Sequence, residues 1–215
     1  MPFFITGSDS IFPSVELAHK DGLLAIGGDL SYDRLTDAYK KGIFPWNNAD
    51  EPICWYCPDP RFVLYPADLK VSRSMQTVLN KKKFTFSVDT AFTGVIHNCR
   101  NAKGRRDEGT WITDEIEEAY TMLFKKGLAH SAETWMGGKL VGGLYGVQMG
   151  KVFFGESMFA SEDNASKFAF INYVKKVEND GISLIDCQVY TPHLESLGAT
   201  FISRKKFISL LEKLI

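Results

Sequence analysis

The segment 129-AHSAETWMGGKLVGGLYGVQMGKVFFGESMF-159 decides the fold, because it contains three apolar strands separated by two glycine turns. The strands are predicted over residues 129–135, 140–148 and 152–159. The turns fall at Gly137-Gly138 and at Gly150. Connections this short join antiparallel neighbours, so the segment is predicted to form a three-stranded meander.

The elements around this meander complete a mixed sheet. From residue 84 onward the pattern predicts a strand, two helices, the meander, a helix, a strand and a last helix. The elements outside the meander are expected at 84–88, 89–100, 113–127, 164–179, 182–190 and from 203 onward. Asp89 is expected to cap the first of these helices. This order is typical of a GNAT-like acyltransferase sheet with helices packed on it.

The first 80 residues differ from the rest, because glycine and proline interrupt them repeatedly. Two short helices are predicted, over 31–41 with Ser31 as N-cap and over 71–81 with Ser72 near its start. We therefore expect an α+β protein with two domains. These are a small N-terminal α+β domain with aromatic loops, residues 1–65, and a GNAT-like C-terminal domain, residues 66–215.

The composition fits a folded chain. Of the 215 residues, 45% are hydrophobic and 24% are charged, which provides enough apolar surface for a core. No stretch approaches the ~20 apolar residues of a membrane span, and the N-terminus lacks a signal-peptide pattern. We therefore expect a cytoplasmic protein with no membrane contact.

Cys54 and Cys57 form a CxxC pair, which can bind zinc or carry out thiol redox chemistry. No second CxxC or HxxxH supplies the remaining zinc ligands. Pro58 follows at once and blocks the helix that a thioredoxin-like motif would open. We expect two reduced, partly buried cysteines and no metal site.

Basic residues are concentrated in one segment, although 25 Lys and Arg residues nearly balance 26 Asp and Glu residues in the whole chain. Residues 81–106 have a net charge of +6, which leaves −7 for the rest. The basic residues are Lys81, Lys82, Lys83, Arg100, Lys103, Arg105 and Arg106. Two interpretations are open, namely solvated helix ends or a surface that follows the phosphates of a nucleic acid.

Three polar residues stand in otherwise apolar strands. Glu156 interrupts the third strand of the meander, and Asp186 and Gln188 follow one another on one face of the strand predicted at 182–190. A buried carboxylate must be paired or hydrogen-bonded. A carboxylate beside an amide at a strand end can orient an amine nucleophile, or it can be a structural hydrogen-bond pair.

Aromatic and apolar residues also allow two interpretations. Loop tryptophans such as Trp46 and Trp111 can stack on nucleotides or close a small core. A helix stripe of Phe170, Tyr173 and Val177 can line an apolar pocket or simply be core. Leu144, Phe153 and Ile185 from the neighbouring strands are expected on the same side as that stripe.

Nine blocks of the chain carry a family resemblance. They are 22-GLLAIGGDL-30, 42-GIFPW-46, 58-PDPR-61, 72-SRSM-75, 108-EGTWIT-113, 141-VGGLYGV-147, 155-GESMF-159, 164-NASK-167 and 185-IDCQ-188. In this order they closely resemble the bacterial leucyl/phenylalanyl-tRNA–protein transferases. The resemblance spans residues 11 to about 206, nearly the whole chain.

The resemblance implies an enzyme that moves Leu or Phe from Leu-tRNA or Phe-tRNA to the N-terminal α-amine of proteins that begin with Arg or Lys. The product carries a destabilising N-terminus for a bacterial degradation pathway. The ester of the aminoacyl-tRNA is already activated, so the resemblance implies no metal, no acyl-CoA and no other cofactor. We expect a monomer.

The resemblance also implies site residues. Trp46 and Trp111 match residues that hold the terminal adenosine, and Glu156 matches the residue that fixes the aminoacyl-adenosine end. Asp186 and Gln188 match the pair that orients or deprotonates the amine, and a proton route through the ribose hydroxyl is equally consistent. The other substrate-binding positions are Leu144, Phe153, Gly155, Ser157, Phe170, Tyr173, Val177 and Ile185. The basic residues of 81–106 then fit a contact to the tRNA acceptor stem.

Two other functions are compatible with part of the sequence. An acyl-CoA-dependent N-acetyltransferase would share the sheet but needs a glycine-rich turn for the pyrophosphate. The corresponding turn here, residues 160–164, has no glycine and contains two carboxylates. A non-catalytic tRNA-binding module would explain the tryptophans and the basic segment, but not Glu156, Asp186 and Gln188.

Overall fold

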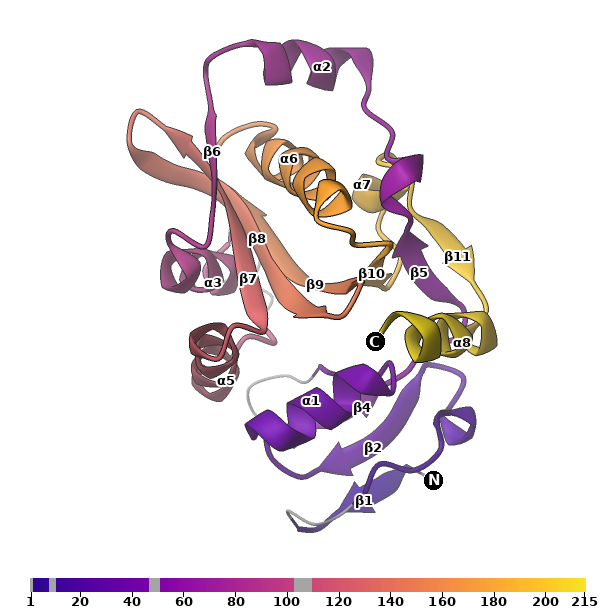
Figure 1. Cartoon of the computed structure of the whole chain (residues 1–215). Helices are drawn as coiled ribbons and strands as arrows, with labels where there is room; N and C mark the ends of the chain where they lie inside the picture. Colours follow the sequence, from indigo (N-terminus) through magenta and orange to yellow (C-terminus); the bar gives the residue numbers. More distant parts are fainter. Residues whose placement is uncertain (1, 8–10, 47–50, 103–109) are drawn as a thin grey trace.

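The computed structural model describes residues 2–7, 11–46, 51–102 and 110–215. It contains a small sheet near the N-terminus and a large sheet that carries most of the helices (Figure 1). The α+β class and the GNAT-like order of elements predicted from residue 84 onward are confirmed.

The small sheet has four strands in the order β1-β2-β4-β3. Its elements are β1 (Phe3–Ile5), β2 (Leu23–Gly27), α1 (Tyr32–Lys40), β3 (Phe44–Pro45) and β4 (Cys54–Tyr56). A short 3-10 helix, η1 (Val15–Leu17), precedes β2. The core of this unit is built around Trp55, which is fully buried and donates from Nε1 to the Gly27 carbonyl over 2.8 Å.

The large sheet has seven strands in the order β11-β5-β10-β9-β8-β7-β6. The strands are β5 (Arg61–Leu64), β6 (Thr85–Val88), β7 (Ala129–Met136), β8 (Lys139–Met149), β9 (Val152–Ala160), β10 (Leu184–Gln188) and β11 (Thr200–Ile202). The predicted meander is confirmed, because β7, β8 and β9 pair antiparallel in sequence order. β10 returns parallel to β9 after a helix has crossed the sheet.

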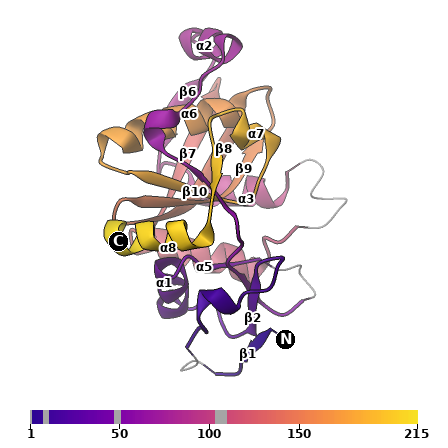
Figure 2. The same ribbon diagram turned by 90° about the vertical axis from the view of Figure 1, so that its right-hand side faces the viewer.

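Helices cover both faces of the large sheet (Figures 1 and 2). The helices that cover them are α3 (Phe92–Arg100), α5 (Asp114–Lys125) and α6 (Ala165–Asn179), and the other helices after β5 are the 3-10 helix η2 (Pro66–Asp68), α2 (Arg73–Asn80), α7 (Pro192–Glu195) and α8 (Arg204–Leu214). Successive residues of β8 point to opposite faces. Tyr145 therefore joins the core beside α3 and α5, whereas Leu144 joins the core beside α6.

Helix caps depend on local sequence, and the cap predicted at Ser31 is confirmed. The side chains of Ser31, Ser72 and Thr113 each accept a backbone N–H of the helix that follows. The cap predicted at Asp89 is wrong, because helix α3 begins at Phe92. The Asp89 side chain is turned instead to β7, where it accepts the Ser131 N–H over 2.8 Å.

The chain passes from the small sheet to the large one before Arg61. Residues 61–64 lie within the unit expected over 1–65, and they form β5, which pairs with β10 and β11 in the large sheet. Helix α8 lies between the two sheets in both ribbon views (Figures 1 and 2). The side chains of Phe207 and Leu211 pack directly over Gly42, where a Cβ would lie 2.9 Å and 3.2 Å from them.

Candidate active site

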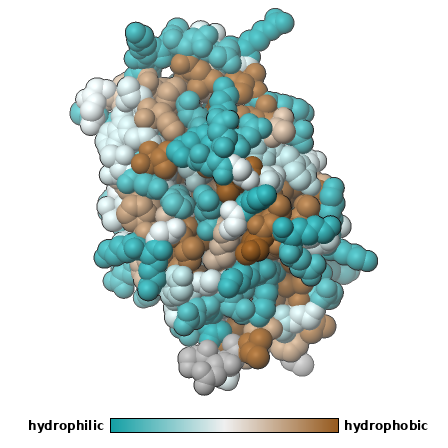
Figure 3. Space-filling model, in the orientation of Figure 1, coloured by the Kyte–Doolittle hydropathy of each residue, from teal (hydrophilic) through white to brown (hydrophobic). Residues whose placement is uncertain are grey.

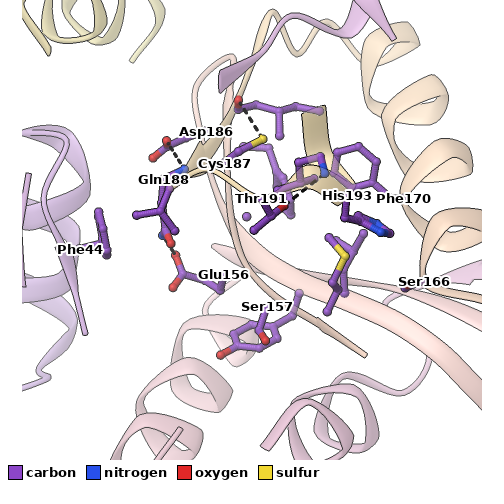
Figure 4. A pocket seen from close by; sticks show the side chains of 18 of the residues that line it. Phe44, Glu156, Ser157, Ser166, Phe170, Asp186, Cys187, Gln188, Thr191 and His193 are labelled. Atoms are coloured by element: carbon purple, nitrogen blue, oxygen red, sulfur yellow. Dashed lines mark hydrogen bonds between the residues drawn. The ribbon is translucent and has the colours of Figure 1, made fainter. Parts of the chain in front are cut away.

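The site lies where two parallel strands separate. β9 and β10 pair only from Val152 to Phe154 and from Leu184 to Asp186. Beyond these residues a cavity of about 400 Å³ opens, walled by both strands and by residues of β3, α6 and α7. Figure 4 shows Glu156 and Gln188 at one end of this cavity and Phe170 and His193 at the other.

Glu156 sits on a β-bulge of β9. Tyr145 pairs with Ser157 and Gly146 with Gly155, so Glu156 is the extra residue between two pairs. A bulge redirects a side chain that regular alternation would place elsewhere. The carboxylate accepts hydrogen bonds from the hydroxyls of Tyr39, over 2.7 Å, and Tyr120, over 3.0 Å.

The protonation of Glu156 is finely balanced. Burial raises the pKa of Glu156 to about 7, although the hydrogen bonds from Tyr39 and Tyr120 act to lower it. Burial and the nearby Glu156 charge raise the pKa of both tyrosines well above the usual value, so their hydroxyls remain donors. The group can therefore hold or release a proton near neutral pH.

Gln188 also sits at an irregularity, where the register of β10 against β5 shifts between Asp186 and Gln188. Its φ of 61° lies in the left-handed region, which residues other than glycine rarely adopt. The backbone turns tightly here, with the Val189 N–H donated to the Cys187 carbonyl over 2.7 Å. Gln188 Nε2 donates to Glu156 Oε1 over 2.9 Å, which joins the two strands across the opening.

Asp186 is held by a cation. Arg61 of β5 donates from Nε to Asp186 Oδ1 over 2.8 Å and from Nη2 to Oδ2 over 2.6 Å. Both residues are fully buried. Burial acts to lower the pKa of Arg61, but the attraction of Asp186 prevails and raises it. Asp186 Oδ1 also accepts the Gln188 N–H over 2.9 Å.

The apolar end of the cavity contains most of the residues expected there. Leu144, Phe153, Phe170 and Ile185 line it, together with Met158, Cys187 and Leu194. The predicted positions Gly155 and Ser157 also line the cavity. Tyr173 and Val177 are buried in the same core but are not among the described lining residues, and the Tyr173 ring packs against Phe153 at 4.7 Å.

Both predicted adenosine-binding tryptophans line the cavity. Trp46 is 45% exposed and follows β3, with its ring 5.9 Å from Tyr56. Trp111 precedes α5 and is half-buried. The structure therefore brings aromatic rings from the small sheet and from the large unit to one cavity, which offers stacking surfaces for a flat ring.

The predicted tRNA-binding residues fall into three groups. Lys81, Lys82 and Lys83 are exposed after α2, and hydrophilic side chains project in this region of Figure 3. Lys83 pairs with Glu162 over 3.1 Å. Arg100 is ion-paired with Asp114 and Glu117, so its charge is compensated. Lys103, Arg105 and Arg106 lie outside the described residues.

Four residues of the site had not been assigned a role from the sequence. Tyr39 and Tyr120 were indistinguishable from core aromatics on helix faces, because their partner Glu156 is remote in sequence. Arg61 stood in the block 58-PDPR-61, and the need of a buried Asp186 for a cation was the available signal. His193 lines the cavity, and burial lowers its pKa.

The described residues contain neither a cluster of metal ligands nor a membrane-spanning helix. In the part of the chain that the structure describes, no three His, Cys, Asp or Glu side chains are grouped to hold a metal ion. No helix among the described residues is long and apolar enough to cross a membrane. Cys54, Cys57, Cys99 and Cys187 form no disulfide bond with one another.

Comparison with solved structures shows the fold. The chain superimposes on the crystal structure of FemX with a TM-score of 0.52, over 88% of this chain and 74% of that one. Only 10% of the residues are identical. This likeness concerns the arrangement of the elements and not the chemistry of the site.

Comparison of sequences shows the family. The model of the leucyl/phenylalanyl-tRNA protein transferase matches residues 63–212, and the model of its N-terminal domain matches residues 28–59. The chain is 52% identical to the leucyl/phenylalanyl-tRNA–protein transferase of Syntrophus aciditrophicus, over 99% of this chain and 89% of that protein. It is 53% identical to the one of Nitrosospira multiformis, over 97% and 90%. The chain therefore belongs to the leucyl/phenylalanyl-tRNA–protein transferase family.

Proposed function

We propose that this protein transfers Leu or Phe from aminoacyl-tRNA to the N-terminal α-amine of proteins that begin with Arg or Lys. It acts as a cytoplasmic monomer and supplies substrates to protein degradation. Family membership supports the reaction class. The observation that carries the proposal is a single cavity with the Glu156–Gln188 pair at one end and an apolar wall at the other.

The apolar end receives the side chain of the donor amino acid. Phe153, Phe170 and Ile185 are almost fully buried there, so a Leu or Phe side chain gains free energy by leaving water. A polar or charged side chain would lose its hydration with few partners in return. Trp46 and Trp111 stack on the terminal adenosine of the tRNA.

The polar end receives the acceptor amine. Gln188 Nε2 donates to Glu156, and this orients Gln188 Oε1 away from that carboxylate, where it can accept a hydrogen from the amine. The amine nitrogen attacks the ester carbonyl carbon and forms an amide, and the bond from that carbon to the ribose oxygen breaks. The amine loses one proton and the leaving ribose oxygen gains one. The aminoacyl ester of the tRNA is already activated, so the reaction needs no further activating group.

The tRNA contacts the exposed lysines after α2. Lys81 and Lys82 provide a local positive charge on a chain whose net charge is −1, and Lys83 lies beside them with its charge paired to Glu162. Such charges attract phosphates without reading a base sequence. The preference for acceptors that begin with Arg or Lys is supported by the family resemblance.

One assay tests the proposed function. The protein is incubated with Leu-tRNA or Phe-tRNA, labelled in the amino acid, and with three peptides that differ only in a first residue of Arg, Lys or Ala. We expect label in the Arg and Lys peptides and little in the Ala peptide. Retention of tRNA without transfer to any peptide would favour a binding module, and acetyl transfer from acetyl-CoA would overturn the proposal.

A further inference from the structure

The backbone of Gln188 has a conformation that is unfavourable for residues other than glycine. It combines a φ of 61° with a tight turn closed by the Val189 N–H and the Cys187 carbonyl. Strained residues persist only where the surrounding structure fixes them. The support must come from groups that contact this turn directly.

Asp186 provides that support. Its Oδ1 accepts the Gln188 N–H over 2.9 Å, so the carboxylate binds the backbone of the turn directly. The Asp186 side chain is 0% exposed, and both oxygens accept hydrogen bonds from Arg61. The two charge-assisted hydrogen bonds from one guanidinium fix the orientation of the carboxylate.

Arg61 in turn packs against two aromatic rings. The Phe44 and Phe207 rings lie 4.7 Å and 4.6 Å from its Cζ atom. Phe44 belongs to the small sheet and also lines the cavity, whereas Phe207 belongs to α8. The planar guanidinium makes two parallel bonds to one carboxylate, a geometry that a lysine does not reproduce. Arg61 thus joins β5, the small sheet and α8 to the strand that carries Gln188.

We infer that Arg61 is a positioning residue of the transfer reaction, which acts through Asp186 to hold the backbone of Gln188 so that its amide meets Glu156 and the acceptor amine. This role rests on the proposed function. In this arrangement Asp186 orients Gln188 and takes no proton from the acceptor amine. A displacement of about 1 Å at a reacting group can cost about a hundredfold in rate.

The test compares transfer by the wild type with transfer by Arg61→Met, Arg61→Lys and Asp186→Asn. Methionine fills the space between Phe44 and Phe207 but makes no ion pair, and asparagine keeps the shape of Asp186. We expect kcat per folded molecule to fall about 10- to 100-fold in Arg61→Met and Asp186→Asn, with donor KM within about threefold of the wild type. Arg61→Lys should be intermediate.

The matched control is Arg34→Lys. Arg34 is also a buried arginine, with a 5% exposed side chain and an ion pair to Asp29, but it is not among the described residues that line the cavity. We expect it to keep the wild-type kcat. Circular dichroism gives the folded fraction of each variant, so that a loss of folding is separated from a loss of rate.

A second readout follows Gln188 without any reaction. The side-chain amide of Gln188, observed by 15N–1H NMR, should have a distinct shift in the wild type because it donates to Glu156, and should move toward that of a free glutamine in Arg61→Met and Asp186→Asn. The inference is overturned if this signal stays unchanged, or if Arg61→Met keeps wild-type kcat while Asp186→Asn abolishes transfer. If the wild type itself transfers nothing, the proposed function fails, and the NMR signal still tests the positioning.

Discussion

At the scale of single residues, the site depends on two side chains placed at irregular positions. Gln188 stands on a strained turn, and Glu156 stands on a bulge between paired residues. Each contributes a group to the hydrogen bond that joins the two strands, Gln188 Nε2 to Glu156 Oε1. Irregularities of this kind cost stability, and they persist at functional sites.

The strain at Gln188 can be measured by comparing two variants that both lack its amide. Gln188→Gly removes the penalty of a positive φ, whereas Gln188→Ala keeps it. We expect Gln188→Gly to be more stable than Gln188→Ala by about 1 kcal/mol in urea denaturation. Equal stability would mean that the backbone at this position is not strained. Both variants should lose transfer.

The stability of the protein should depend on pH through Glu156. Its pKa is about 7 in the folded protein and 4.5 in the ordinary case. A raised pKa means that the folded state binds the proton more tightly than the unfolded state does. Protonated Glu156 therefore adds to the free energy of unfolding below pH 4.5, and this contribution is lost as the pH rises to about 7. Glu156→Gln lacks this loss. Urea denaturation at several pH values should therefore show that the free energy of unfolding of the variant rises relative to that of the wild type between pH 4.5 and 7. A difference that stays constant over this range would refute the raised pKa.

At the scale of elements, the packing of α6 on β8 supports the wall of the cavity. Gly142 of β8 has no room for a side chain, because a Cβ there would lie 2.6 Å from the Cβ of Ala165 and 2.7 Å from its carbonyl carbon. The N-terminal end of α6 therefore rests directly on the strand. Phe170, five residues further along the helix, reaches the cavity from this position.

Gly142→Ala should therefore destabilise the protein by about 1–3 kcal/mol, because the added methyl forces α6 away from β8. Gly155→Ala is the matched control in the neighbouring strand, where the nearest atom to a Cβ is the Asp186 carbonyl oxygen at 3.5 Å. We expect that change to stay within about 0.5 kcal/mol. Thermal and urea denaturation of both variants would check this, and equal destabilisation would contradict the packing argument.

The elements were largely predictable from the sequence, and the reason is local. Ser31, Ser72 and Thr113 cap helices with atoms a few residues away, so the signal lies within one window of sequence. Asp89 failed as a cap because its partners, Ser131 and His130, come from a distant strand. A tertiary contact there overrides a local preference.

The site was predictable only in part, for the same reason. Family blocks pointed to Glu156 and Gln188, but the bulge and the turn that aim them depend on pairing between strands. Tyr39 reaches Glu156 across 117 positions, and Arg61 reaches Asp186 across 125. No periodicity within one helix or strand contains that information.

At the scale of the whole molecule, the two sheets meet at the cavity and at α8. Phe44 comes from β3 of the small sheet, and Trp46 comes from the loop that follows β3. The strands β9 and β10 come from the large sheet. Phe207 of α8 packs against Arg61 and over Gly42, so the C-terminal helix connects both units. A donor bound to Trp46 and to β9 therefore spans the junction.

The exposed lysines after α2 should determine how tRNA binding responds to salt. Replacing Lys81, Lys82 and Lys83 by Ala should weaken binding and lower the slope of log K against log salt concentration by about 2, because Glu162 already compensates the charge of Lys83. Arg100→Ala is the control, since Asp114 and Glu117 already compensate its charge. Filter binding at several salt concentrations measures both. An unchanged slope in the triple variant would exclude these lysines from the tRNA contact.

In the proposed function, one cavity brings an aminoacyl ester and an α-amine together at Glu156 and Gln188. The most direct test of this function is single-turnover transfer of labelled Phe from Phe-tRNA to a peptide that begins with Arg, by the wild type and by Gln188→Ala at equal occupancy by Phe-tRNA. We expect transfer by the wild type and a loss of at least about a hundredfold in the variant. No transfer by the wild type, or equal rates for both proteins, would contradict it.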